Sequence, residues 1–147
     1  MTSATIPVFQ QTLEKTNNWL DEIMELLDWS DRRKAYKALR VVLHTLRDRL
    51  TTEEVTDLAS QMPMLIRGMY LEGWNPNANP QRMRSSTAFV QAVNQNFTES
   101  DHVSSNDITF AVLKVLERHI SQGEIEDVVG NLPKQLQELW SEARTSN

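Results

Sequence analysis

The sequence has 147 residues, of which 39% are hydrophobic and 24% are charged, and it carries a net charge of −5. This length and composition are typical of one soluble globular domain and exclude a largely disordered chain. The absence of cysteine excludes disulfide scaffolds, thiolate metal sites and cysteine nucleophiles.

Four helices are predicted in the first half of the chain. Apolar residues recur with the 3.6-residue period of an amphipathic helix over about 10–28. The residues on this face are Leu13, Trp19, Leu20, Ile23, Met24 and Leu27.

Ser30 is the predicted N-cap of a second helix. Thr51 and Glu54 predict a capping box, in which the Thr51 hydroxyl accepts from the Glu54 amide and the Glu54 carboxylate reaches back to the Thr51 amide. Pro63 lacks a backbone donor and predicts the first position of a fourth helix.

The second half of the chain repeats this pattern at a spacing of 70 residues. The alignment needs no gap from 19 to 140, and it pairs caps with caps, core positions with core positions and one helix-starting proline with another. The matched pairs include Trp19/Phe89, Leu20/Val90, Leu46/Leu116, Thr51/Ser121, Glu54/Glu124, Pro63/Pro133 and Tyr70/Trp140. We interpret this register as an internal duplication of a four-helix unit.

These patterns predict an all-α fold of about eight helices, because no segment alternates apolar and polar residues long enough to form a sheet. We expect one domain over residues 1–147, with repeats at about 10–72 and 84–143 and a connector at 73–83. Each repeat alone has a small core, so we expect the two to pack together about a pseudo-twofold axis.

Several segments also resemble a known family. They are AYKALRVVLHTLRDRL, EEVTDLASQMPMLIRGMYLEGWNP, GEIEDVVGNLP and LQELW, within a span from Trp19 to Trp140. Together they resemble the bacterial family known as domain of unknown function 2267. The resemblance implies a small all-helical bacterial protein with tandem repeats, and it implies no activity and no catalytic residue.

No arrangement of residues in the sequence predicts catalysis. Among the histidines His44, His102 and His119, no pair has the i, i+4 spacing that places two metal ligands on one helix face. Glu99 and His102 have the Glu-x-x-His spacing of di-iron bundles, but a second such motif and two further inward glutamates are missing. We therefore expect no enzyme activity, no metal and no cofactor.

The second predicted helix carries a basic stripe and keeps a polar face, so it is expected nearer the surface than its apolar mate in the second repeat. The stripe consists of Arg33, Lys37, Arg40, His44 and Arg47. Such a stripe could contact a phosphate backbone or an acidic partner. The favoured interpretation is a solvated face that pairs with the acidic residues of the first helix. Those acidic residues are Asp21, Glu22, Glu25 and Asp28.

The segment from Arg67 to Arg84 has two interpretations. Most of it has no counterpart in the second repeat, and its Asn-Pro pairs favour a connector in which Trp74 anchors the path to the core. Alternatively, its aromatic and arginine residues form a binding patch, because these residue types are enriched at interaction hot spots. The candidate residues are Arg67, Tyr70, Trp74, Arg82 and Arg84.

The function predicted from these observations is a non-enzymatic protein-interaction module. The alternative is a binder of an anionic small molecule or nucleic acid, through the arginines of that segment or the basic stripe. The negative net charge favours a protein partner or self-association over nucleic acid. No apolar run approaches the ~20 residues of a membrane span, and the N-terminus does not resemble a signal peptide, so we expect a cytoplasmic protein.

Overall fold

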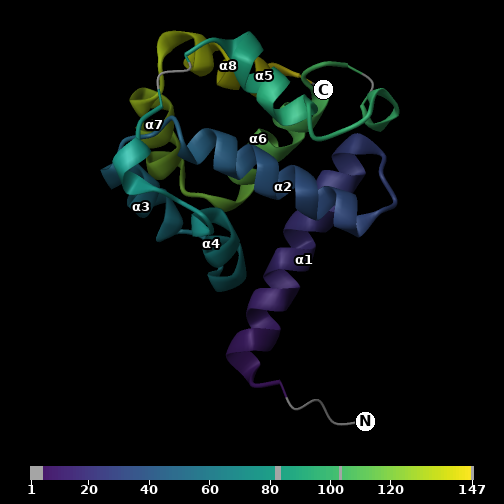
Figure 1. Cartoon of the computed structure of the whole chain (residues 1–147). Coiled ribbons are helices and arrows are strands. Elements are labelled where there is room, and N and C mark those ends of the chain that lie inside the picture. Colours follow the sequence, from purple (N-terminus) through teal and green to yellow (C-terminus); the bar gives the residue numbers. More distant parts are fainter. Residues whose placement is uncertain (1–4, 82–83, 103, 147) are drawn as a thin grey trace.

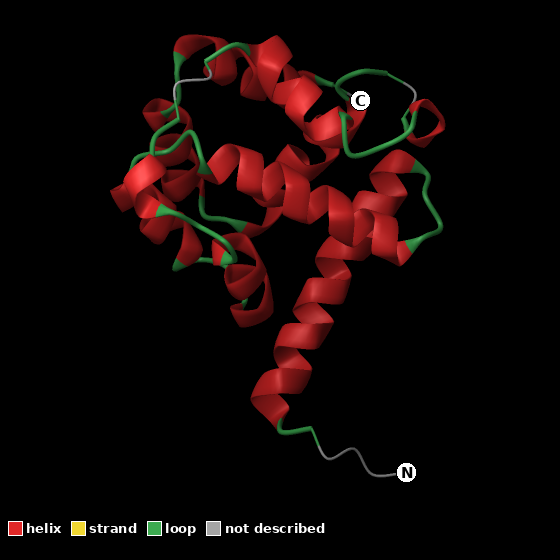
Figure 2. Ribbon diagram, viewed as in Figure 1, coloured by secondary structure: helices red, strands yellow, loops and turns green. Residues whose placement is uncertain are grey.

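The computed structural model describes residues 5–81, 84–102 and 104–146. These residues form helices and no strand, which confirms the predicted all-α class (Figure 2). The α-helices are α1 (Pro7–Leu27), α2 (Arg32–Arg47), α3 (Thr52–Ala59), α4 (Met64–Leu71), α5 (Ser86–Asn94), α6 (Asp107–His119), α7 (Gln122–Asn131) and α8 (Lys134–Thr145). Two single-turn 3-10 helices, η1 (Pro76–Ala78) and η2 (Glu99–Asp101), lie in the longer connections. None of the helices in this part of the chain is both long and apolar enough to span a membrane.

Local side-chain caps start several of these helices. The predicted Thr51 cap of α3 is confirmed, because its hydroxyl accepts from the Glu54 amide at 3.3 Å. At α2 the predicted cap Ser30 is wrong by one residue, and the Asp31 carboxylate caps the helix instead. Pro63 immediately precedes α4 rather than occupying its first position. These differences are the size expected when only local signals mark a helix end.

Helices α2 and α6 both lie at the centre of the molecule. α2 packs against α1, α4, α5 and α6, whereas α6 packs against α1, α2, α5 and α8 (Figure 1). The buried residues of α2 are Ala35, Ala38, Leu39, Val41, Val42, Leu43, Thr45, Leu46 and Arg47. The prediction that this helix lies nearer the surface is therefore wrong. Its polar residues His44 and Arg47 bond to backbone carbonyls of and beside α4, so they do not mark a solvated face.

The segment after α4 is fixed to the body through Asn79. The Trp74 indole donates to Asn79 Oδ1 at 2.9 Å. The Asn79 amide in turn donates to the carbonyls of Arg47 and Leu50 at 2.8 and 2.9 Å. Trp74 itself is half-buried against the core. Since one amide closes the end of α2 and holds the indole, this segment follows a defined path over the surface.

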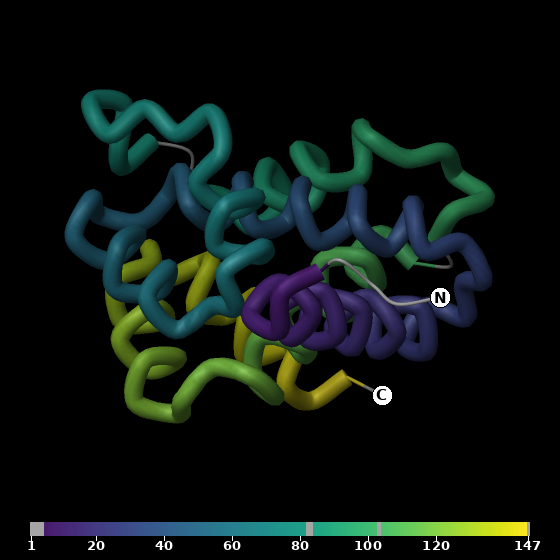
Figure 3. Tube along the Cα trace, turned by 90° about the horizontal axis from the view of Figure 1, so that it is seen from below, coloured from purple at the N-terminus to yellow at the C-terminus, as the bar shows by residue number. Residues whose placement is uncertain are grey.

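α1 extends beyond the body of the molecule as an N-terminal arm, defined here as residues 7–15. Figure 1 shows the arm projecting away from the other helices, and Figure 3 views it nearly end-on. α1 has 21 residues and α5, about 70 residues further along, has 9. At ~1.5 Å per residue, the difference of 12 residues adds about 18 Å of helix. The arm touches the body through Thr12, whose hydroxyl accepts from the Leu65 amide at 2.9 Å.

Candidate functional site

The residues of the predicted Arg67–Arg84 patch do not share one surface. Tyr70 is fully buried, its hydroxyl donates to the Val55 carbonyl, and burial raises its pKa above the usual range. Arg67 donates to the carbonyls of Ala59 and Met62 at 2.9 and 3.0 Å, at the end of α3. Trp74 is held by Asn79, as described above. Arg84 is exposed, and Arg82 lies outside the described residues. The described aromatic members of the patch, Tyr70 and Trp74, thus contribute to packing.

The basic stripe of α2 is also divided between two environments. Arg33 is exposed, the Lys37 amine lies 5.1 Å from the Phe97 ring centre, and the Arg40 guanidinium lies 6.0 Å from that of Tyr36. His44 bonds to the Met69 carbonyl at 2.7 Å, and burial lowers its pKa below the usual range. The stripe therefore does not continue along the whole helix as a charged surface.

Arg47 has a structural role at the end of α4. Its guanidinium donates to the carbonyls of Tyr70 and Glu72, both at 2.9 Å, and it is only 6% exposed. Helix ends leave carbonyl groups without intrahelical donors, and a buried guanidinium supplies them. A residue engaged in this way is not available to a phosphate or an acidic partner.

The predicted pairing between α1 and α2 is wrong for Glu22. One ion pair, Arg32–Asp21, does join the two helices, but Arg32 is not part of the basic stripe. Glu22, however, forms ion pairs with Arg118 and His119 of α6. The sequence order suggested α2 as the neighbour, whereas α1 in fact packs against both central helices.

A pair of buried carboxyl groups lies where α3 meets α7. Glu54 and Glu124 are 8% and 9% exposed, and the Thr51 amide bonds to Asn131 Oδ1 at 2.9 Å instead of to Glu54. The second half of the predicted capping box is therefore wrong. Burial, together with the hydrogen bond and the negative charge of Glu124, raises the pKa of Glu54 to about 8. A protonated Glu54 can donate to the Glu124 carboxylate, so one proton satisfies both groups.

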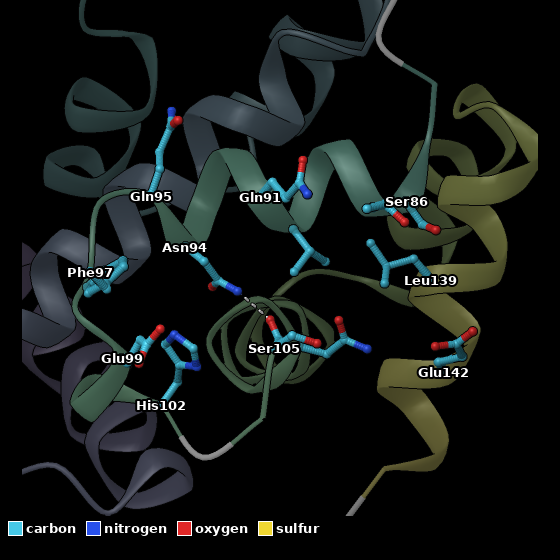
Figure 4. Close-up of a pocket in the computed structure, with 13 residues that line it drawn as sticks. Ser86, Gln91, Asn94, Gln95, Phe97, Glu99, His102, Ser105, Leu139 and Glu142 are labelled. Carbon is cyan, nitrogen blue, oxygen red and sulfur yellow. Dashed lines mark hydrogen bonds between the residues drawn. The ribbon is translucent and has the colours of Figure 1, made fainter.

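Figure 4 shows a polar cleft between α5, α6 and α8, with a volume of about 660 Å³. Glu99 and His102 lie on one side of it and Glu142 on the opposite side. Asn94 donates to the Ser105 carbonyl at 2.6 Å across the floor of the cleft. Within the described residues, no group of three or more potential ligands is placed to hold a metal ion. Seven of its 13 lining residues carry amide or hydroxyl side chains, which can bond to water or to polar ligands.

An apolar trough runs between α1, α2 and α4 on another face. Two adjoining hollows of about 530 and 510 Å³ form it and share Leu13, Tyr36, Leu65 and Met69. The remaining apolar lining residues are Phe9, Leu20, Met64 and Ile66. Leu13 belongs to the predicted apolar face of α1, and it is 47% exposed because it lies where this helix leaves the body. The trough could receive one helix along its length.

The sequence analysis missed the trough, although a signal was present. The large hydrophobic side chains that the structure exposes are Ile6, Val8, Phe9, Leu13, Tyr36, Met64 and Leu65. All of them belong to the arm and the two helices beside it or to Ile6 just before it. Ile6 and Phe9 continue the spacing of Leu13 upstream of the predicted helix start, and no charged residue falls within 5–13.

The trough and the polar cleft use residues 70 positions apart. Leu20 and Met69 line the trough, and Val90 and Leu139 line the cleft. At other paired positions the chemistry changes. Tyr36 of the trough corresponds to Asn106 of the cleft, and Arg32 corresponds to His102.

Comparison with known proteins agrees with the family resemblance noted from the sequence. A search of curated proteins found no match. The family model for DUF2267, described as an uncharacterized conserved protein, matches residues 16–139. The match runs from the middle of α1 to α8 and covers most of the chain, while the arm precedes it. The chain therefore belongs to the DUF2267 family.

Proposed function

We propose that the chain is a non-enzymatic protein-interaction module whose partner binds in the apolar trough between α1, α2 and α4. One observation carries this proposal. The exposed large hydrophobic residues of the described chain gather on the arm and around the trough instead of being scattered. A contiguous exposed apolar patch on a soluble protein is a sign of an interaction surface.

The shape of the trough favours a helix as the ligand. The helices α1 and α4 flank the trough, and α2 contributes Tyr36 to its lining. An amphipathic helix that lays its apolar face into a groove presents anchors at i, i+3, i+4 and i+7. Each anchor that leaves water contributes on the order of 25 cal/mol per Å² of apolar surface. Tyr36 and the methionines Met64 and Met69 add adaptable contacts of the kind enriched at interfaces.

We also propose that the scaffold is a tandem duplication whose halves pack about a pseudo-twofold axis. Reciprocal contacts at a spacing of 70 residues support this. The Thr51 amide donates to Asn131, and the Ser121 amide donates to Gln61, at 2.9 and 3.0 Å. A second reciprocal pair of contacts between the two halves involves aromatic rings. Trp19 stacks on His119 with ring centres 4.9 Å apart, and Arg49 lies 5.8 Å from the Phe89 ring centre.

A duplicated scaffold gives a reason for one apolar and one polar hollow. Two equal four-helix units would start with two equal hollows. The first now carries Tyr36 and a long arm. The second carries Asn106 at the position that matches Tyr36, and its α5 is short. Divergence of this kind supports a binding role for the trough, because the fold itself accepts either chemistry.

A comparison of two variants tests the proposal. Leu13→Glu places a charge in the middle of the trough, whereas Gln11→Glu places the same charge on the opposite side of the same helix. Both side chains are exposed, so both variants should keep the helical circular dichroism of the wild type. In a pull-down from a lysate of the native host, we expect a protein retained by the wild type and by Gln11→Glu but lost with Leu13→Glu. Equal captures by all three proteins would contradict the proposal, as would retention of nucleic acid alone.

A further inference from the structure

We propose that the occupant of the trough is the arm of a second copy of this chain, so that two copies form a symmetric dimer with antiparallel arms. This inference rests on the proposed function, because it names the partner for the same trough. Its basis is that the chain exposes both an apolar helix and an apolar groove, side by side.

The arm has the properties of the helix that the trough would receive. Phe9 and Leu13 of the arm are 50% and 47% exposed, and Ile6 just before the arm is 51% exposed. In the sequence these three residues are spaced at i, i+3 and i+7. Residues 5–13 carry no charge, in a chain of which 24% is charged. An isolated helix of this length is marginal in water, so packing against another surface would stabilise it.

Symmetry allows one contact to cover both features. In a twofold dimer each contact occurs twice. If the arm of the first copy contacts the trough of the second, the arm of the second contacts the trough of the first. Leu13 lines both hollows and so lies in the middle of the trough. With the axis near Leu13, each arm lies in the trough of the other copy, and the two arms cross in opposite directions.

A different helix would cover less of the exposed surface. The apolar stripe continues past the trough to Ile6, which lines neither hollow. A partner confined to the trough leaves that end of the arm in water. A second arm fills the trough and runs along the first arm at the same time.

The exposed area is sufficient for a reversible dimer. Seven large side chains that are about half exposed leave on the order of 600 Å² of surface per copy, or about 1,200 Å² for two copies, which is the lower end of the range for specific interfaces. Interfaces of that size are commonly of moderate affinity, so we expect dissociation in roughly the micromolar range. The dimer should therefore depend on concentration.

Sedimentation velocity of the full chain from about 1 µM to about 1 mM tests the inference. The wild type and Gln11→Glu should shift from monomer to dimer over this range. Leu13→Glu should weaken dimerisation by at least about tenfold, because two charges would meet near the axis. The absence of native cysteine allows a second test. Leu13→Cys should form a disulfide-linked dimer on mild oxidation, and Gln11→Cys should not.

The outcomes separate the inference from the proposed function. A wild type that stays monomeric over the whole range overturns the second-copy inference. Suppose that the monomeric wild type binds a purified partner protein, that Gln11→Glu also binds it, and that Leu13→Glu does not. The proposed function then stands, and only the identity of the partner is wrong. A dimer that forms equally well in Leu13→Glu uses another surface and also overturns the inference. If Leu13→Glu also binds every partner protein that the wild type binds, the proposed function is contradicted as well.

Discussion

At the scale of single residues, the fold changes the pKa of Glu54 most clearly. Burial at the α3–α7 interface and the neighbouring Glu124 raise its pKa to about 8, from an ordinary value of 4.5. Between these two values the folded protein holds a proton that the unfolded chain releases. Stability is then expected to fall as the pH rises from about 4.5 to about 8 and to be insensitive to this group outside that window.

Glu54→Gln should remove this dependence. The amide stays neutral, so we expect the free energy of unfolding near pH 8.5 to rise by on the order of 2 kcal/mol relative to wild type and to be little changed at pH 4.5. Urea unfolding at several pH values measures both quantities. Glu53→Gln, an exposed neighbour on the same turn, serves as the matched control. An equal slope with pH in wild type and Glu54→Gln would contradict this account.

Arg47 illustrates a polar residue that is part of the core. Arg47→Met keeps much of the side-chain volume but leaves the carbonyls of Tyr70 and Glu72 without their donor. We expect a loss of about 2–3 kcal/mol of stability, because buried acceptors without donors are costly. The exposed Arg33, substituted in the same way, should cost less than about 0.5 kcal/mol. Urea unfolding of the two variants side by side measures the difference, and similar losses would show that Arg47 has no special role.

At the scale of elements, the connector after α4 depends on one side chain. Asn79→Ala removes the acceptor of the Trp74 indole and two donors to the end of α2. We expect a loss of about 1–2 kcal/mol and faster amide exchange in residues 74–81. Asn77→Ala, on the same exposed segment, should change neither, since the Asn77 side chain makes none of these bonds. Hydrogen–deuterium exchange that leaves the segment equally protected in both variants would contradict the expectation.

Sequence reasoning was most successful where a helix depends on its own residues. The Thr51 hydroxyl caps α3 as predicted, because that bond spans only three residues. The other half of the same capping box fails because the Thr51 amide finds Asn131, 80 residues away. The position of α2 was misjudged for a related reason, since the groups that satisfy Arg47 belong to another helix. Pairings between distant elements cannot be read from local pattern.

The candidate site was harder to predict than the fold. Helical periodicity placed Leu13 correctly on the apolar side of α1. Only the structure shows that α1 extends beyond the body of the molecule there, which leaves Leu13 exposed. Conversely, Tyr70 and Arg67 have the residue types of a binding site, yet their partners are core atoms and backbone carbonyls. Whether an apolar or aromatic residue is covered depends on the tertiary arrangement of helices, which composition and spacing do not determine.

At the scale of the whole molecule, the two halves share one core. A single cluster of buried side chains includes residues from all eight α-helices, and α2 and α6 lie against each other within it. We expect one cooperative unfolding transition, with coincident curves from circular dichroism and tryptophan fluorescence. A chain ending at residue 72 should not form a stable fold, because its α1 and α2 would lose their contacts with α5 and α6. Two separated transitions, or a folded half, would contradict this expectation.

The central claim is that the trough around Leu13 is where a protein partner binds. The most direct measurement places a photo-crosslinking amino acid at position 13 and, in a matched protein, at position 11, and irradiates each in a lysate of the native host. We predict covalent protein adducts from position 13, either to a second copy or to another protein, and few from position 11. Adducts that are absent from position 13, or equally frequent at both positions, would contradict the account.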